Sequence, residues 1–148
     1  MGEWADRALK KLQETSSKER LEEELELVRH YQTVAAAEKQ WKTLIHFIET
    51  ETEDFNRKKE REFFAVSGVG NELEVAAPEL RLKLKLDLRT PSVDFQYREP
   101  YPNREEKDSG EYRFRLKDNK VFLVGQYDNE TPLSVETVGG ELLDPLVK

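Results

Sequence analysis

The residues best suited to metal binding or nucleophilic catalysis are few and widely separated. The chain has two histidines, His30 and His46, and no cysteine. Sixteen residues along an α-helix rotate by about 160°, so one helix cannot direct both imidazoles at a single ion. His46 and Glu49 lie three residues apart and could share a metal, but a zinc site needs three or four ligands. We therefore expect no metal and no other cofactor, and we interpret His46 as a side chain beside an apolar stripe.

The sequence also contains no short catalytic motif. No pattern that positions a catalytic serine, cradles a phosphate or binds a dinucleotide occurs in it. Acidic residues number 31, and the run of glutamates from 22 to 24 is best explained as a solvated helix face, or else as a docking strip for a basic partner. Asp94 and Asp128 could act as general acids or bases, but nothing nearby indicates a shifted pKa. The sequence therefore favours a non-enzymatic protein, and we assign no catalytic residue.

Charge and hydropathy restrict the partners of the chain. Of its 148 residues, 36% are hydrophobic and 37% are charged, and the net charge is -7. A chain of this size can bury a substantial core. Nucleic acids and anionic membranes bind cationic surfaces, so a net negative charge disfavours both as partners. No run reaches the roughly 20 apolar residues of a membrane span, and the first residues lack the apolar core of a signal peptide. We expect one cytoplasmic domain, residues 1–148, with no membrane contact and nucleic-acid binding disfavoured.

Residues 1–61 are predicted to be helical. A first helix is expected over 3–14 and a break at 15–17, because Ser16 and Glu19 have capping-box spacing. From about 17 to 59, apolar residues recur with the period of a helix that buries one face. Thr50 and Glu53 repeat the capping-box spacing and would permit a second break, although one long helix is the simpler interpretation. The stripe comprises Leu27, Val34, Trp41, Ile48 and Phe55, joined by Val28, Ala35, Leu44 and Ile45.

Residues 62–148 are predicted to form an antiparallel sheet of about six strands. In residues 80–88 leucine alternates with charged residues, which predicts one buried and one solvated face. Shorter strands are expected at 63–67, 72–76, 93–97, 112–117 and 121–127, with a mobile loop at 99–110 and a C-terminal helix after Ser134. The predicted fold is α+β: a long N-terminal helix, or a helical hairpin, on one face of an antiparallel meander.

The same alternation predicts a basic outward face on the sheet. Its cations could pair with acidic residues on neighbouring strands, namely Glu72, Glu74 and Asp94. They could instead bind a partner that carries acidic groups. Weak nucleic-acid binding is a third interpretation, disfavoured because aromatic residues do not interleave these cations as stacking platforms. The outward cations are Arg81, Lys83, Lys85, Arg113, Arg115 and Lys117.

The predicted helical stripe is longer than the sheet it can cover. Six strands about 4.8 Å apart span roughly 25 Å, whereas 43 helical residues span roughly 65 Å. The uncovered half would be an aggregation liability, so it must meet the first helix, a second copy or another protein. We expect a homodimer through the helices. The residues assigned to this partner-binding stripe are Leu21, Leu25, Leu27, Val28, Val34 and Trp41.

The function predicted from the sequence is that of a protein–protein interaction module: an adaptor, a chaperone-like protein or a regulatory subunit. The alternative is a small-ligand-binding protein or enzyme with a pocket between the helices and the sheet. The residues that would line this pocket are Tyr31, Trp41, Phe95, Tyr97 and Tyr112.

Overall fold

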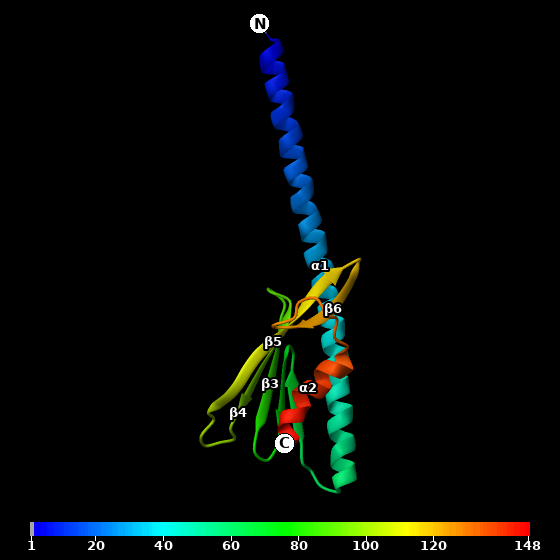
Figure 1. Ribbon diagram of the computed structural model, residues 1–148, viewed down its shortest axis with the longest axis vertical. Helices are drawn as coiled ribbons and strands as arrows, with labels where there is room; N and C mark the ends of the chain where they lie inside the picture. Colours follow the sequence, from blue (N-terminus) through cyan, green and yellow to red (C-terminus); the bar gives the residue numbers. More distant parts are fainter. Residues whose placement is uncertain (1) are drawn as a thin grey trace. The chain divides into compact units, whose positions relative to one another are not determined.

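The structure, a computed structural model, describes residues 2–148 and confirms the predicted α+β fold class (Figure 1). A long helix comes first, six strands follow it, and a short helix ends the chain. The elements are α1 (Glu3–Lys59), β1 (Ala65–Val69), β2 (Glu72–Ala76), β3 (Arg81–Asp87), β4 (Ser92–Arg98), β5 (Glu106–Lys117), β6 (Lys120–Gly125) and α2 (Val135–Val147).

The chain divides into two compact units, and the boundary lies inside α1 between Gln32 and Thr33. The described part of the first unit is helical from Glu3 onward. The second unit contains the remainder of α1, the whole sheet and α2. The single domain expected from the sequence stays a prediction.

Helix α1 is continuous, so the expected break at residues 15–17 and the helical hairpin are both wrong. The Thr15 hydroxyl donates to the carbonyl of Lys11 at 2.9 Å, and the Thr52 hydroxyl donates to that of Ile48 at 2.7 Å. Such bonds to the preceding turn let these side chains stay within a helix. Serine and threonine cost a helix only a few tenths of a kcal/mol, roughly, and this cost does not end it.

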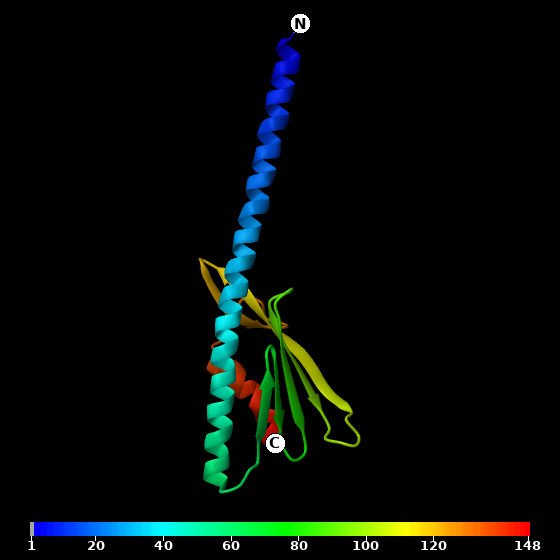
Figure 2. The same cartoon turned by 180° about the vertical axis from the view of Figure 1, so that it is seen from behind.

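Asn56 organises the connection from α1 to β1. The helix ends at Lys59, and the next residue, Glu60, has a φ of 56°, the left-handed conformation typical of the position after a helix C-terminus. The Asn56 Oδ1 atom accepts hydrogen bonds from the backbone N–H groups of Phe63 and Phe64, both at 2.9 Å. Its Nδ2 donates to the Phe64 carbonyl at 2.9 Å. Figure 2 shows this connection from behind. Strand β1 begins at Ala65, two residues later than predicted.

The six strands form one antiparallel sheet in chain order, β1 to β6. Asp118 and Asn119 connect β5 to β6, and their φ values of 52° and 62° are those of a two-residue turn that suits the twist of a hairpin.

Strand β5 begins at Glu106, so the predicted loop at 99–110 is too long. Residues 106–111 contain no apolar side chain, and this part of β5 therefore lacks the alternation that marks a strand. Its backbone pairing with β4 defines it instead.

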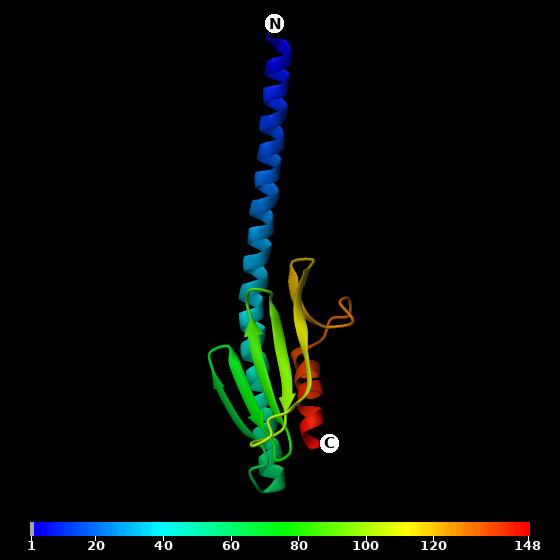
Figure 3. The same cartoon turned by 90° about the vertical axis from the view of Figure 1, so that its left-hand side faces the viewer.

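The core forms between one face of the sheet and the part of α1 that follows residue 33. Trp41, Leu44 and Ile48 of α1 are buried in one hydrophobic core with the leucines of β3. Directly paired residues of antiparallel strands share a face, so the pairing of Leu82 with Tyr97 places both on the core side. Figure 3 shows the strands in front of this part of α1. Each fully buried leucine contributes about 1.5–3 kcal/mol.

Helix α2 covers the same face of the sheet, and Val138, Leu142 and Leu146 join the core. Its first turn is capped by the Ser134 hydroxyl, which accepts a hydrogen bond from the backbone N–H of Thr137 at 3.1 Å. The helix predicted after Ser134 is therefore confirmed. Gly139 has a packing role, because a Cβ atom there would overlap the ring of Phe47 on α1, whereas a Cβ at Gly140 would meet open space.

The two neighbouring glycines of α2 provide a matched pair of substitutions. We expect Gly139→Ala to lower the free energy of unfolding by about 1–3 kcal/mol, since the added methyl must displace the Phe47 ring. Gly140→Ala should raise it by up to about 1 kcal/mol through helix propensity alone. Urea denaturation followed by circular dichroism measures both changes. Equal effects of the two substitutions would contradict this packing of α2 on α1.

Candidate partner-binding surfaces

The unit of residues 2–32 carries a series of exposed apolar side chains. Every described residue of this unit is exposed except Ala8, which is partly buried. The series is interrupted at residues 13–20, which are all polar or charged. Exposed apolar patches mark an interaction site or an aggregation liability. Of the predicted stripe, Leu21, Leu25, Leu27 and Val28 belong to this unit, with exposed fractions between 52% and 59%. The series consists of Trp4, Leu9, Leu12, Leu21, Leu25, Leu27, Val28 and Tyr31.

The other two residues assigned to the stripe lie in the second unit. Val34 is partly buried, and Trp41 is only 3% exposed within the core. Leu27, Val34 and Trp41 are spaced seven residues apart in the sequence. The exposed fraction of the side chain falls from Leu27 to Trp41, and Trp41 is too buried to contact a partner. Sequence reasoning included Trp41 because periodicity identifies a face of a helix and says nothing of what covers that face.

The five aromatic residues proposed to line a pocket are not brought together. Tyr31 is exposed in the first unit and Trp41 is a core residue of the second. Phe95 does lie beside both Tyr97 and Tyr112, with ring centroids 5.8 and 5.6 Å apart. A small recess of about 220 Å³ between α1 and α2 is lined by other residues, among them Phe47, Thr52, Phe55, Phe64 and Leu143.

The two tyrosines of this cluster fasten α2 to the sheet. The Tyr97 hydroxyl donates to the Leu142 carbonyl at 2.6 Å, and the Tyr112 hydroxyl donates to the Glu141 carboxylate at 2.7 Å. Burial raises the pKa of both hydroxyls, and the Glu141 carboxylate raises the pKa of Tyr112 further. Both tyrosines therefore stay protonated and keep their donor role near neutral pH.

Acidic residues interrupt the outward face of the sheet. The pairing of β2, β3 and β4 aligns Glu72, Lys85 and Asp94 in one row across the sheet. In the next row, Glu74 lies opposite Lys83. This alternation matches the interpretation that the cations pair with acids on neighbouring strands.

The six predicted cations fall into two groups on this face. Arg81, Lys83 and Lys85 lie on β3, whereas Arg113, Arg115 and Lys117 lie on β5, and β4 separates the two strands. Arg113 forms an ion pair with Glu111 at 2.7 Å, and Arg81 contacts Glu74 at 3.6 Å. Both pairs are substantially exposed, and such pairs contribute roughly 0–1 kcal/mol.

Asp94 and Asp128 occupy different electrostatic environments. Burial raises the pKa of Asp94 above its ordinary value, and the nearby carboxylates of Glu111 and Asp87 act in the same direction. The hydroxyl of Ser92, which donates to Asp94 at 3.2 Å, opposes them. Asp128 caps a turn: it accepts from the backbone N–H groups of Glu130 and Thr131. Hydrogen bonds from Thr131 and Glu130 lower the pKa of Asp128.

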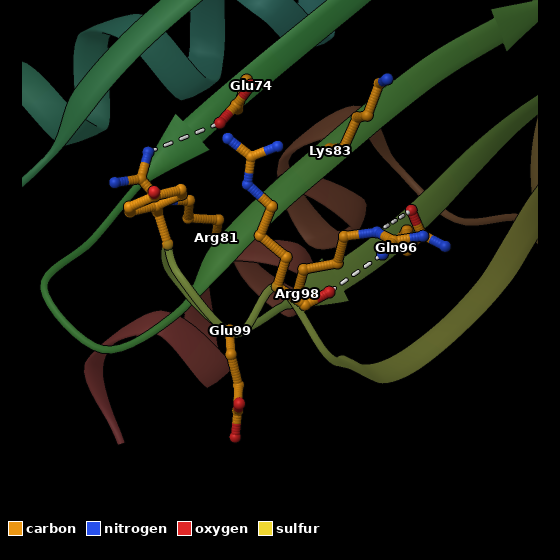
Figure 4. Close-up of a pocket in the computed structure, with 8 residues that line it drawn as sticks. Glu74, Arg81, Lys83, Gln96, Arg98 and Glu99 are labelled. Carbon is orange, nitrogen blue, oxygen red and sulfur yellow. Dashed lines mark hydrogen bonds and ion pairs between the residues drawn. The ribbon is translucent and has the colours of Figure 1, made fainter.

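A cleft of about 600 Å³ opens where the outward face meets the loop that follows β4 (Figure 4). Sequence reasoning named three of its residues, the cations Arg81 and Lys83 and the acid Glu74, but missed Arg98, Tyr101 and Arg104. The last two lie in a loop that has no periodic signal, and only the folded chain brings them beside β3. The lining residues are Glu74, Arg81, Lys83, Gln96, Arg98, Glu99, Tyr101 and Arg104.

Comparisons of the chain with protein-family models, with curated proteins and with solved structures find no match. Across residues 2–148, no three or more histidine, aspartate or glutamate side chains are grouped so that they could hold a metal ion. No helix in the described part of the chain has the length and apolar character needed to cross a membrane. Functional inference therefore depends on the surfaces described above.

The raised pKa of Asp94 predicts a pH-dependent effect of Asp94→Asn. When the pKa of a carboxyl group is higher in the folded state than in the unfolded state, its protonated form stabilises the folded protein. This stabilisation is lost as the pH rises above the ordinary pKa of the group, here 3.8. We therefore expect Asp94→Asn to gain stability relative to the wild type between pH 3 and pH 7. Chemical denaturation across this pH range measures the difference.

Asp54→Asn is the matched control of opposite sign. Lys58, which hydrogen-bonds to Asp54, and Arg57 lower the pKa of Asp54, so its contribution to stability is present above the ordinary carboxyl pKa and lost below it. This variant should lose stability relative to the wild type as the pH rises from 3 to 7. The same pH trend in both variants would contradict the environment assigned to Asp94.

Proposed function

We propose that this protein is a non-enzymatic protein–protein interaction module that forms a homodimer through the helix of residues 3–32. The observation that carries the proposal is the series of exposed apolar side chains from Trp4 to Tyr31. Helices in water gain most of their stability from packing of an apolar face. Within residues 2–32 no described side chain is fully buried, so a second helix would supply the missing packing.

The distribution of charge along this helix supports pairing with a second copy. Residues 7–18 contain four cations, Arg7, Lys10, Lys11 and Lys18, and a single acid. Residues 19–26 have the opposite balance, with five glutamates and a single arginine. Opposite charges flanking a helical seam favour association and set the orientation of the two helices.

These charge blocks favour an antiparallel pair. In a parallel pair each basic block would lie beside a basic block, and each acidic block beside an acidic one. An antiparallel pair that crosses near Lys18 brings the basic block of one copy to the acidic block of the other. It also places Leu9 of one copy at the level of Leu27 of the second. These two leucines lie eighteen residues, or five helical turns, apart and share one face of the helix.

Sedimentation equilibrium of the full chain at micromolar concentration tests the dimer. We expect the wild type to have twice the monomer mass, and the double variant Leu9→Glu/Leu27→Glu to have the monomer mass, because four carboxylates would enter the apolar seam. The control is Val69→Glu/Tyr127→Glu, which places the same charge at two even more exposed apolar positions of the second unit. It should leave the dimer intact. A monomeric wild type would overturn the proposal.

The orientation of the helices is tested by spin-label distances. The chain contains no cysteine, so Trp4→Cys provides a unique attachment point. In an antiparallel pair that crosses at Lys18, the two labels lie about 42 Å apart along the helix axis. In a parallel pair they lie about 10 Å apart. A short distance would contradict the antiparallel arrangement while leaving the dimer itself in place.

A further inference from the structure

We propose that the cleft between β3, β4 and the loop of residues 99–105 binds a nucleotide, with the phosphates on its arginine and lysine side chains and the base against Tyr101. All of the residues that line this cleft belong to the unit of residues 33–148. The proposal therefore does not depend on association through the helix of residues 3–32.

The cleft has an excess of positive charge although the protein is acidic. Four cations line it, Arg81, Lys83, Arg98 and Arg104, against two acids, Glu74 and Glu99. One of these acids is engaged elsewhere, since the Glu99 carboxylate forms an ion pair with Lys107 at 2.8 Å. A concave surface with an excess of one sign of charge focuses the electric field and raises the local concentration of ions of opposite charge. In a protein of net charge -7, this cleft is therefore a local site for anions.

Arg98 organises the loop and is best described as a positioning residue. Its Nε donates to the Gln96 side chain at 2.7 Å, and its Nη1 donates to the backbone carbonyl of Arg104 at 3.0 Å. The Glu99 N–H also donates to the Glu105 carbonyl at 2.8 Å. These bonds close the loop upon itself, so Tyr101 and Arg104 are held at the rim of the cleft.

The remaining cations retain hydrogen-bonding capacity for a ligand. Arg81 contacts Glu74 only at 3.6 Å, and its buried Nε has no hydrogen-bond acceptor among the described residues. Lys83 is exposed on the strand beside it. Figure 4 shows Arg81, Lys83 and Arg98 around the cleft. Guanidinium groups bind phosphate through paired N–H donors, and lysine binds it as a point charge.

Tyr101 provides the apolar part of the site. Tyr101 is 75% exposed, and the Arg104 guanidinium lies 5.2 Å from the centroid of its ring. Aromatic rings and arginine planes are the groups on which nucleobases stack. The cleft volume of about 600 Å³ falls within the range of roughly 300–1,000 Å³ typical of small-molecule sites, so base, sugar and phosphates can be accommodated together.

A single nucleotide fits this surface better than a nucleic-acid strand. A bound nucleic-acid strand would extend from the cleft across the neighbouring row of residues on the sheet, where Glu72 and Asp94 flank Lys85. These carboxylates would repel its phosphates. The chain also offers one aromatic platform at the cleft, whereas binding of a strand uses several in succession.

Isothermal titration calorimetry of the full chain with ADP tests the proposal. We expect binding of one ADP per chain, no binding of adenosine, and weaker binding of pyrophosphate because it lacks the base. Arg81→Gln and Arg104→Gln should each weaken ADP binding about tenfold, equivalent to about 1.4 kcal/mol. Tyr101→Leu should weaken the binding of ADP and leave that of pyrophosphate unchanged.

Arg115→Gln is the matched control, because Arg115 is an exposed arginine on the same face of the sheet but outside the cleft. It should bind ADP as the wild type does. Thermal unfolding of each variant establishes that it is folded, and Arg104→Gln, in the loop, tests the proposal if Arg81→Gln fails to fold. The variant Leu9→Glu/Leu27→Glu should bind ADP normally, which separates this proposal from the homodimer.

Three outcomes would overturn the proposal. The first is the absence of ADP binding at millimolar concentration. The second is an equal loss of affinity in Arg115→Gln and Arg81→Gln, which would indicate general electrostatic attraction. The third is pyrophosphate affinity equal to that of ADP, which would remove the base and Tyr101 from the site.

Discussion

The burial of one stripe of α1 on the leucine face of the sheet is the interaction on which the second unit depends. Ala37, Trp41, Leu44 and Ile48 cover a face that would otherwise expose Leu82 and its neighbours to water. A one-layered sheet has no means of burying that face by itself. The choice of buried face also determines the other one, since side chains alternate along a strand. Packing of α1 thus sets which charges face solvent, and so places Arg81 and Lys83 in the cleft.

The charge of the protein is organised locally. Its surface is acidic on average, yet acids and bases alternate across the sheet where Glu72, Lys85 and Asp94 share a row. Asp94 nevertheless has a raised pKa, because it is partly buried and lies near the carboxylates of Glu111 and Asp87, whereas Lys85 in its own row acts in the opposite direction. The cleft beside the 99–105 loop departs from the pattern because one of its two acids is paired with Lys107. The arginines and lysine there are left with an excess of positive charge.

Elements with a strong periodic pattern were predicted well, and the others were not. Strand β3 was evident because leucine and charged residues alternate through it, and β2 was predicted with its observed bounds. The first half of β5 was missed because it consists of polar residues paired by backbone alone. The expected break near Ser16 was wrong because capping-box spacing also occurs within helices. A local signal of this kind competes with hydrogen bonds that run through the whole of α1.

The sequence by itself determined the class of fold, the type of most elements and the side of β3 that is buried. These follow from the periods of helix and strand, which are properties of the local backbone. Tertiary structure alone decided which members of one heptad row are covered, since Leu27 is exposed and Trp41 is buried. It also decided which residues line the cleft. Arg81, Arg98 and Arg104 come together only through the pairing of β3 with β4 and the path of the loop that follows β4. Both depend on contacts between residues distant in the chain, which a repeat along the sequence does not encode.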